Sequence, residues 1–311
     1  MRIRFSALLT AMLLWLSGGV AQEAARTAEI FDRSGDAGHL TIRFLWLGEQ
    51  VADDKPGDCM ILTSPDGQVM VLDCGHPLAS QYVIDALDAM GVTRIDALVI
   101  SHPHIDHLGG VPALYARYEI GTVYSSALVY EKSSYYRAYV EATANTPHVY
   151  LKEGDSFQFG DSVRVDVYNP PAEITYPKDY PTGATQFINN QSLALKFTYG
   201  ESTAMLAGDL YAAGEREVVS RWGDALDCDI MKANHHGAST SSTSVWRKAV
   251  SPQITFITSD TIEDLSIAKK YTKNGQQMYH TLIDGCIRVQ TPGDGTYTVL
   301  TEKDRTTTLF D

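Results

Sequence analysis

The sequence predicts an α/β sandwich in which two β-sheets pack face to face and helices cover their outer surfaces. Strand and helix patterns alternate along the chain, and two stretches repeat the same order of hairpin, helix and strand. Two packed sheets with external helices would account for that alternation. The 311 residues are 44% hydrophobic, which is enough to build the core of one large domain.

The elements follow from periodicity and turn residues. The first half predicts a strand at 39–47, a hairpin at 59–73 turning at Pro65-Asp66-Gly67, a helix near 78–90 and a strand at 95–101. The second half predicts a hairpin at 192–207, a helix near 212–222 and a strand at 228–233. A helix near 243–250, a strand at 253–258 and a closing hairpin at 287–301 complete the chain. Residues 170–189 lack a clear period and predict a long loop, and loops of that length are often functional.

The N-terminus differs in kind from the rest of the chain. Arg2 and Arg4 precede the apolar run 8–16, and small residues follow up to Ala21. This pattern is typical of a secretory signal peptide, and the run is too short for a comfortable membrane span. We therefore expect a signal peptide at 1–21, an N-terminal linker at 22–38 and a single catalytic domain at 39–311. The mature protein would be extracellular or periplasmic, with no stable membrane insertion after cleavage.

Cysteine usage and charge restrict the function. The cysteines, Cys59, Cys74, Cys228 and Cys286, show no Cys-x-x-Cys spacing and lie in or beside predicted strands, so buried free thiols are favoured over disulfides. Without residues 1–21 the chain keeps 23 basic against 38 acidic residues, a formal net charge of −15. Nucleic-acid-binding proteins usually carry a basic face, and no cluster of Lys and Arg is present here. The charge therefore disfavours nucleic acid as a partner without excluding it.

One short segment predicts the chemistry. Within the run Ser101-His102-Pro103-His104-Ile105-Asp106-His107, three histidines and an aspartate follow a buried strand and precede Gly109-Gly110. Imidazole and carboxylate groups are the ligands of zinc and similar divalent ions. His102 and His104 are two residues apart, so in an extended segment they point the same way. Asp106 and His107 come after a turn and can address a second ion.

Two distant segments complete such a site. The apolar strand at 203–207 ends in Gly208-Asp209, and the strand at 228–233 ends in Asn234-His235-His236-Gly237. Like the first motif, both follow the C-terminal end of a predicted strand, where α/β sheets place ligand sites. Either histidine of the His235-His236 pair can be the ligand, and the spacing alone does not decide between them.

These motifs resemble the signature of the metallo-β-lactamase superfamily. The segments 70–75, 154–161, 190–193, 229–236 and 257–260 extend the similarity from about residue 40 to residue 289. Over that length the chain is similar to two branches of the superfamily. One is the secreted phosphorylcholine esterase that acts on teichoic acid, and the other is the hydrolase domain of the competence DNA-channel (ComEC-type) protein.

The resemblance implies an αββα fold and a dinuclear centre, most readily with two Zn²⁺ ions and alternatively with Mn²⁺. His102, His104 and Asp209 would hold the first ion. Asp106, His107, Asp209 and His236 would hold the second, and Asp209 would bridge the two. We expect Asp106 and His235 to be the catalytic residues. Asp73 and Asn190 are expected to support ligand side chains from behind, because ligand histidines usually donate their other N–H to such a partner.

Many superfamily members supply one more histidine to the first ion, but the matching region here is Asn189-Asn190-Gln191. The nearest alternative, His148, is predicted to begin a strand. The first ion would therefore keep open positions for water and a substrate oxygen.

The expected function is that of an exported metal-dependent hydrolase, foremost a phosphodiesterase acting on small or terminal phosphodiesters of the cell envelope. A ComEC-like nuclease is the alternative, followed by a β-lactam or lactone hydrolase and by an inactive binding protein. Aromatic side chains near the motif could bind a choline group by cation–π attraction, although aromatics at helical spacing more often pack into a core. They are Tyr130, Tyr135, Tyr136, Tyr139, Tyr176, Tyr180 and Phe187.

Overall fold

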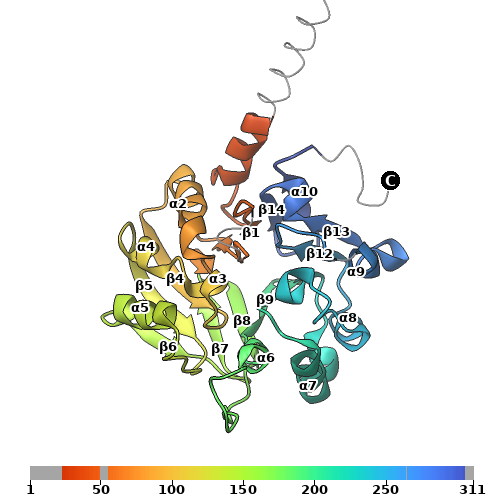
Figure 1. Cartoon of the computed structure of the whole chain (residues 1–311). Helices are drawn as coiled ribbons and strands as arrows, with labels where there is room; N and C mark the ends of the chain where they lie inside the picture. The colour runs from red at the N-terminus through yellow and green to blue at the C-terminus, as the bar shows by residue number, and fades with distance from the viewer. Residues whose placement is uncertain (1–22, 50–54, 264, 305–311) are drawn as a thin grey trace, which may run out of the picture.

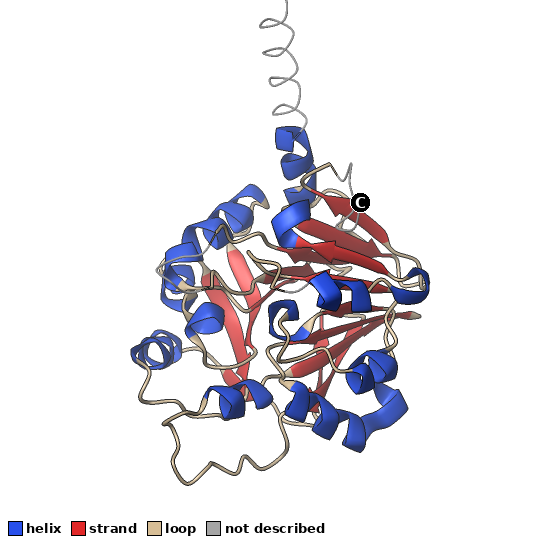
Figure 2. Ribbon diagram, turned by 45° about the vertical axis from the view of Figure 1, so that its right-hand side comes forward, coloured by secondary structure: helices blue, strands red, loops and turns tan. Residues whose placement is uncertain are grey.

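Two β-sheets lie face to face in the middle of the molecule, with helices on their outer surfaces (Figures 1 and 2). This computed structural model describes residues 23–49, 55–263 and 265–304. The expected αββα sandwich is confirmed. The expected signal peptide at 1–21 lies outside the described residues, and no helix among those residues is long and apolar enough to cross a membrane.

The first sheet has eight strands, and it contains both the first strand of the chain that the structure describes and the last two. Its order is β15-β14-β1-β2-β3-β4-β5-β6. The strands are β1 (Leu40–Phe44), β2 (Met60–Thr63), β3 (Val69–Leu72), β4 (Arg94–Ile100), β5 (Glu119–Ser125), β6 (His148–Tyr150), β14 (Ile287–Thr291) and β15 (Thr298–Thr301). The pairs from β3 to β6 are parallel, so these strands end at one edge of the sheet.

The second sheet has seven strands in the order β13-β12-β11-β10-β9-β8-β7. The strands are β7 (Ser156–Phe159), β8 (Val163–Asn169), β9 (Ala194–Tyr199), β10 (Ser202–Ala207), β11 (Ile230–Lys232), β12 (Ile254–Ile257) and β13 (Gln277–His280). The pairs from β10 to β13 are parallel. The C-terminal ends of β10, β11 and β12 therefore meet at one edge, as those of β3 and β4 do in the first sheet.

Helices connect the parallel strands. A helix at 23–31 precedes the first strand. The α-helices that follow are α2 (Ser80–Ala89), α3 (Ile105–Leu108), α4 (Val111–Tyr115), α5 (Ser134–Thr143), α6 (Thr185–Asn190), α7 (Ala212–Trp222), α8 (Ser244–Val250), α9 (Leu265–Lys270) and α10 (Thr281–Asp284). Short 3-10 turns lie at Pro77–Ala79, Gly223–Leu226, Asn234–Gly237 and Lys273–Gly275. Side-chain caps fix some helix starts: Ser133 accepts the N–H of Tyr136 and Thr243 accepts that of Trp246.

The apolar residues form three layers of core. One cluster fills the space between the sheets, where the rings of Phe44 and Phe256 stack 4.4 Å apart. A second cluster lies between the first sheet and its helices, and a third lies between the second sheet and α7 and α8. Strands covered on both faces explain why β2, β3 and β11 are fully buried runs rather than alternating ones.

Two segments depart from the expectations. The linker expected at 22–38 contains a helix at 23–31, and its Ile30 is buried in the core. The buried Arg43 holds this segment by donating to the Ile30 and Asp32 carbonyls and by pairing with Asp36 at 2.9 Å. The loop expected at 170–189 ends in α6. The closing hairpin expected at 287–301 is confirmed as β14 and β15, and β14 pairs with β1 of the first sheet. All four cysteines are buried free thiols, as predicted.

Candidate metal centre

The predicted ligand segments converge because each follows the C-terminal end of a parallel strand. The 101–110 loop follows β4, Gly208-Asp209 follows β10 and Asn234-His235-His236 follows β11. Segments more than a hundred residues apart in sequence thus meet where the edges of the two sheets face each other. The backbone of Gly57 passes so close to this loop that an added Cβ would lie 1.7 Å from the Asp106 carbonyl oxygen, which requires glycine there.

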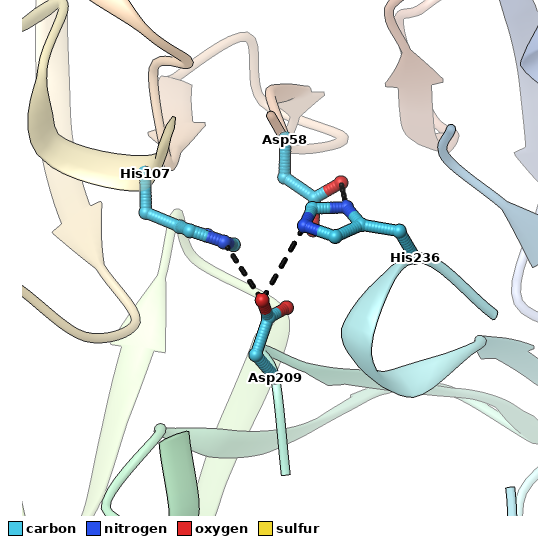
Figure 3. Close-up of side chains that lie close together, drawn as sticks. All are labelled: Asp58, His107, Asp209 and His236. Atoms are coloured by element: carbon cyan, nitrogen blue, oxygen red, sulfur yellow. Dashed lines mark hydrogen bonds and ion pairs between the residues drawn. The ribbon is translucent and has the colours of Figure 1, made fainter. Parts of the chain in front are cut away.

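Asp209 lies at the centre of the cluster (Figure 3). Its Oδ2 atom is 3.2 Å from Nε2 of His107 and 3.3 Å from Nε2 of His236. The Nε2 atom of His102 lies 4.0 Å from the same oxygen. One carboxylate oxygen is therefore within reach of imidazole nitrogens from both halves of the site, as expected of a bridging ligand.

The remaining predicted ligands lie on either side of Asp209. His104 Nδ1 is 2.9 Å from His102 Nε2, which places the first pair side by side. Asp106 Oδ2 is 3.3 Å from His236 Nε2 and 3.8 Å from His107 Nε2. The structure thus brings the six predicted ligand side chains close together, with His102 beside His104 and with Asp106 and His107 near His236.

His236, rather than His235, points its nitrogen among the carboxylates. Its side chain is 2% exposed, whereas that of His235 is 16% exposed and its Nε2 lies 3.9 Å from Asp209. Both histidines have positive φ, 48° for His235 and 53° for His236, and Gly237 follows at 75°. Consecutive non-glycine residues in this region are strained, which is common where a loop must aim functional side chains.

Asp58 is the residue that sequence reasoning missed. Its Oδ1 lies 3.0 Å from Nδ1 of His236, opposite the nitrogen that faces the cluster, and its Oδ2 pairs with Lys232 at 2.6 Å. The Thr258 hydroxyl also donates to Oδ1. Asp58 and Lys232 are fully buried. A lysine in the apolar strand β11 was the available signal, because a buried ammonium group requires an anionic partner.

Asp73 supports the other side of the cluster. Its Oδ2 accepts the Nδ1–H of His107 at 2.9 Å, and the backbone N–H and hydroxyl of Ser101 donate to its two oxygens at 2.7 Å each. This fixes the His107 ring with Nε2 toward Asp209. Asp73 and Asp58 therefore hold one ligand histidine each, the arrangement by which proteins orient metal-bound imidazoles.

The structure places Asn190 away from the expected position. Its Oδ1 accepts the backbone N–H groups of Tyr211 and Gly214 at 3.1 and 3.2 Å, so it caps α7. The neighbouring Asn189 lies beside His104 instead, and among the described residues its buried Oδ1 has no hydrogen-bond partner. The sequence indicated the correct segment but the wrong one of its two adjacent asparagines, because neighbouring residues of a helix such as α6 lie on different faces.

The aromatic residues near the motif mostly pack against one another. Tyr130, Tyr180 and Phe187 surround the small cluster of Leu128, Ala184 and Ile188. The Tyr180 hydroxyl donates to the Val129 carbonyl, and Tyr139 is buried in the core. These contacts fix the 170–189 segment beside the metal-binding loop, with Tyr130 6.5 Å from the His104 ring. They favour the packing interpretation over an open choline box.

The two halves of the site differ in how their surroundings shift the pKa of the histidines. Burial alone would lower the pKa of His107, but Asp209, Asp106 and Asp73 raise it well above its usual value. Burial likewise opposes ionisation of Asp209, yet His236 and His107 hold its pKa well below the usual range. For His102 burial prevails and lowers the pKa, so this histidine is neutral near pH 7.

The residues fit divalent cations. Four buried or largely buried carboxylates, those of Asp58, Asp73, Asp106 and Asp209, contact the histidines of the cluster, whereas the buried ammonium group of Lys232 pairs with Asp58 alone. This excess of carboxylates favours cations. Oδ1 of Asp209 is buried without a hydrogen-bond partner among the described residues. Such atoms are rare unless another ligand satisfies them. Asp58, His107, Asp209 and His236 also offer ligand atoms within 4.8 Å of one another.

Comparison with known proteins identifies the family. A family model described as the metallo-beta-lactamase superfamily matches residues 52–257, which include every predicted ligand. The chain belongs to the metallo-β-lactamase superfamily. Together with the cluster of histidines and aspartates, this membership makes the protein a metallo-β-lactamase-fold hydrolase with a candidate metal centre.

Among curated superfamily relatives, the chain is similar to two competence proteins. It is 27% identical over 194 residues to the competence protein ComA of Neisseria gonorrhoeae, covering 62% of this chain and 24% of that protein. It is 27% identical over 185 residues to the ComE operon protein 3 of Bacillus subtilis, covering 58% and 22%. The chain thus spans about a quarter of the length of these relatives.

Among solved structures, the metallo-beta-lactamase fold protein YhfI of Bacillus subtilis superposes with a TM-score of 0.51. The alignment covers 84% of this chain and 99% of YhfI at 11% identity. Similarity at that identity supports the fold and does not extend to the substrate.

Proposed function

We propose that this protein is an exported dinuclear-metal phosphodiesterase that acts on small or terminal phosphodiesters. The observation that carries the proposal is the position of Asp209, whose single Oδ2 faces His102, His107 and His236 at 3.2 to 4.0 Å. A carboxylate so placed suits a bridge between two ions, with His102 and His104 on one side and Asp106, His107 and His236 on the other.

The two ions, Zn²⁺ or alternatively Mn²⁺, would lower the pKa of bound water and neutralise charge on the attacking and leaving oxygens of a phosphodiester. The protein's own residues hold that arrangement in place. Asp73 and Asp58 fix the rings of His107 and His236, and Asp106 stays ionised because those histidines outweigh its burial and hold its pKa well below the usual range. Asn189 leaves room beside His104 where many superfamily members carry a histidine.

His235 is placed to interact with substrate rather than with metal. Burial lowers its pKa to about 4, so it is neutral near pH 7. The Thr240 hydroxyl contacts its Nδ1, and the Asp209 carboxylate 3.9 Å from Nε2 favours the tautomer with hydrogen on Nε2. A neutral imidazole of this kind can donate a hydrogen bond to a phosphoryl oxygen and so stabilise the negative charge that develops there.

The charge of the chain supports a small substrate. A net charge of −15 without residues 1–21, and no cluster of Lys and Arg, would repel an extended polyanion. Export rests on the sequence of residues 1–21. A cell-envelope phosphodiester, with or without a choline group, satisfies both conditions.

The similarity to ComA and the ComE operon protein 3 supports a second candidate, a metal-dependent nuclease. A dinuclear metal centre can promote attack on a phosphodiester in DNA as well as in a small ester. The two candidates differ in how binding depends on salt, because a nuclease releases many counterions on binding DNA and a small-ester hydrolase releases few.

A substrate panel tests the proposal. Purified protein reconstituted with two equivalents of Zn²⁺ or Mn²⁺ is assayed with bis(p-nitrophenyl) phosphate, p-nitrophenyl phosphorylcholine, single-stranded and duplex DNA, and a cephalosporin. We expect turnover of the small phosphodiesters to exceed that of DNA at matched phosphodiester concentration, with weak salt dependence. Asp209→Ala should be inactive, and the exposed Asp161→Asn serves as the matched control. Efficient DNA cleavage with steep salt dependence would establish the nuclease instead, and cephalosporin opening alone would reject both.

A further inference from the structure

A pocket lies directly beside the metal-binding loop, on the side away from the second sheet's ligands. His102 and Pro103 form one wall, and Tyr136 and Tyr139 of α5 with His148 of β6 form the others. His102 also faces Asp209, so a group bound in the pocket lies next to the metal centre. Val140 and Tyr150 at the rim are 46% and 60% exposed, which opens the pocket to solvent.

The wall of this pocket is neutral. None of the described residues that line it carries a carboxylate, ammonium or guanidinium group. His148 lies 2.9 Å from the Ser125 hydroxyl and 3.3 Å from the Tyr139 hydroxyl through the same Nε2. Burial lowers the pKa of His148, so this network is uncharged near pH 7. A charged group entering here would lose its hydration without meeting a counter-charge.

The wall is also rich in aromatic rings and hydrogen-bonding groups. The rings of His148 and Tyr150 stack 4.4 Å apart at 24°, and Tyr136 and Tyr139 present two further rings. The Tyr136 and Tyr150 hydroxyls make no hydrogen bond to another described residue. Aromatic walls bind planar groups by stacking and edge contacts, and free hydroxyls select groups that carry donors or acceptors.

We propose that this pocket binds an uncharged planar ring, the aryl or heteroaryl substituent of the phosphodiester that the metal centre cleaves. The proposal rests on the proposed function and names its substrate class. The ester phosphate would lie at Asp209 and His102, and its ring would extend past Pro103 between α5 and β6. Simple alkyl esters would leave the pocket unfilled.

Binding to the metal-free protein tests the pocket without any turnover. Calorimetric titration with thymidine as a heteroaryl probe, p-nitrophenol as an aryl probe and choline as a cationic probe compares wild type with two tryptophan variants. Ala144 lines the pocket and is exposed at the end of α5, whereas the adjacent exposed Asn145 does not line it. Ala144→Trp should therefore fill the pocket, and Asn145→Trp is the matched control. Tyr136→Phe removes one hydroxyl and keeps the ring.

We expect wild type and Asn145→Trp to bind the ring probes alike, and Ala144→Trp to weaken binding at least tenfold. Tyr136→Phe should weaken thymidine binding about fivefold, the effect of one hydrogen bond. Equal binding in both tryptophan variants, no ring binding by wild type, or tighter binding of choline would overturn the proposal. In the reconstituted enzyme, Ala144→Trp should lower kcat/KM for bis(p-nitrophenyl) phosphate more than for dimethyl phosphate. Ring binding without any phosphodiester turnover would reject the proposed function alone, and turnover insensitive to Ala144→Trp would reject the pocket alone.

Discussion

Replacing Asp58 by asparagine separates the two roles of this buried carboxylate, which are to pair with the charge of Lys232 and to orient the ring of His236. Asp58 accepts the Nδ1–H of His236 at 3.0 Å and pairs with Lys232 at 2.6 Å, and it is fully buried. Asparagine keeps nearly the same volume and can still accept from His236, but it carries no charge. The ammonium group of Lys232 would then remain buried without a counter-ion.

Breaking a buried ion pair by removing one partner costs about 3 to 5 kcal/mol, whereas removing both charges costs little. Asp58→Asn should therefore lower the free energy of unfolding of the metal-free protein by about 3 kcal/mol. The double variant Asp58→Asn/Lys232→Met should recover most of that loss. Metal affinity should respond differently, because a neutral amide supports His236 less well than a carboxylate. We expect a loss of about 10- to 100-fold in both variants.

Chemical denaturation of chelator-treated protein measures the stability change, and competition with a chelator of known affinity measures Zn²⁺ binding. The exposed Asp161→Asn is the control and should alter neither quantity. The reasoning fails if Asp58→Asn costs less than about 1 kcal/mol, or if the double variant is as unstable as the single one. It also fails if the double variant regains wild-type metal affinity, since Asp58 would then have no part in orienting His236.

Further predictions concern the ligands, the protons and the N-terminal segment. Asp209→Ala should abolish activity and reduce the metal content, measured by elemental analysis, below two ions per chain. In the same measurement His236→Ala should lose mainly one ion, and His235→Ala should keep both ions. Zn²⁺ affinity should fall by about tenfold per pH unit for each proton displaced as pH decreases from 8 to 6, since the pKa of His107 is raised well above its usual value; a pH-independent affinity would contradict this. The pKa of His235 is lowered to about 4, below its unfolded value near 6.5, so the unfolded chain binds more protons between these two pH values. His235 therefore makes the metal-free protein more stable as pH rises through that window. In denaturation experiments on His235→Asn, the free energy of unfolding should rise less steeply with pH. Arg43→Met should destabilise the protein by about 3 to 5 kcal/mol in denaturation experiments, because Asp36 would be left buried and unpaired.

The fold was largely predictable because its strongest signals are local. Windows of a few residues are enough to predict the apolar strands, the Pro65-Asp66-Gly67 turn and helix α7. The closing hairpin was also predictable from its local pattern. Its pairing with β1 was not, because the register between two strands that are 247 residues apart leaves no local pattern in the sequence. The helix at 23–31 was missed for a related reason. Its C-terminal end is held by Arg43, which donates to the Ile30 and Asp32 carbonyls, and such contacts belong to the tertiary structure.

The candidate site was predictable only where its chemistry is concentrated. Three histidines and an aspartate between 102 and 107 indicate metal without any structure. Asp209 and the His235-His236 pair became candidates because strand ends in α/β folds collect ligands. The choice of His236 within that pair came from the resemblance to the superfamily. Asn190 was misplaced by one residue, since the sequence does not reveal which face of a short helix meets the site. Asp58 carried no motif of its own, and its contact with His236 joins residues 178 positions apart.

Asp58 also shows why the metal centre and the fold of this protein depend on one another. Its backbone N–H donates to the Asp106 carbonyl, and its own carbonyl accepts the N–H of Gly75, so it anchors the loop that supplies the first ligands. Its side chain contacts Lys232 and His236, which belong to the second sheet. Because both connections are buried, the two sheets cannot separate without leaving charges unpaired. A shift between the sheets would move His236 away from Asp106, which makes the packing of the sandwich a determinant of the geometry of the ligand group that these two residues share.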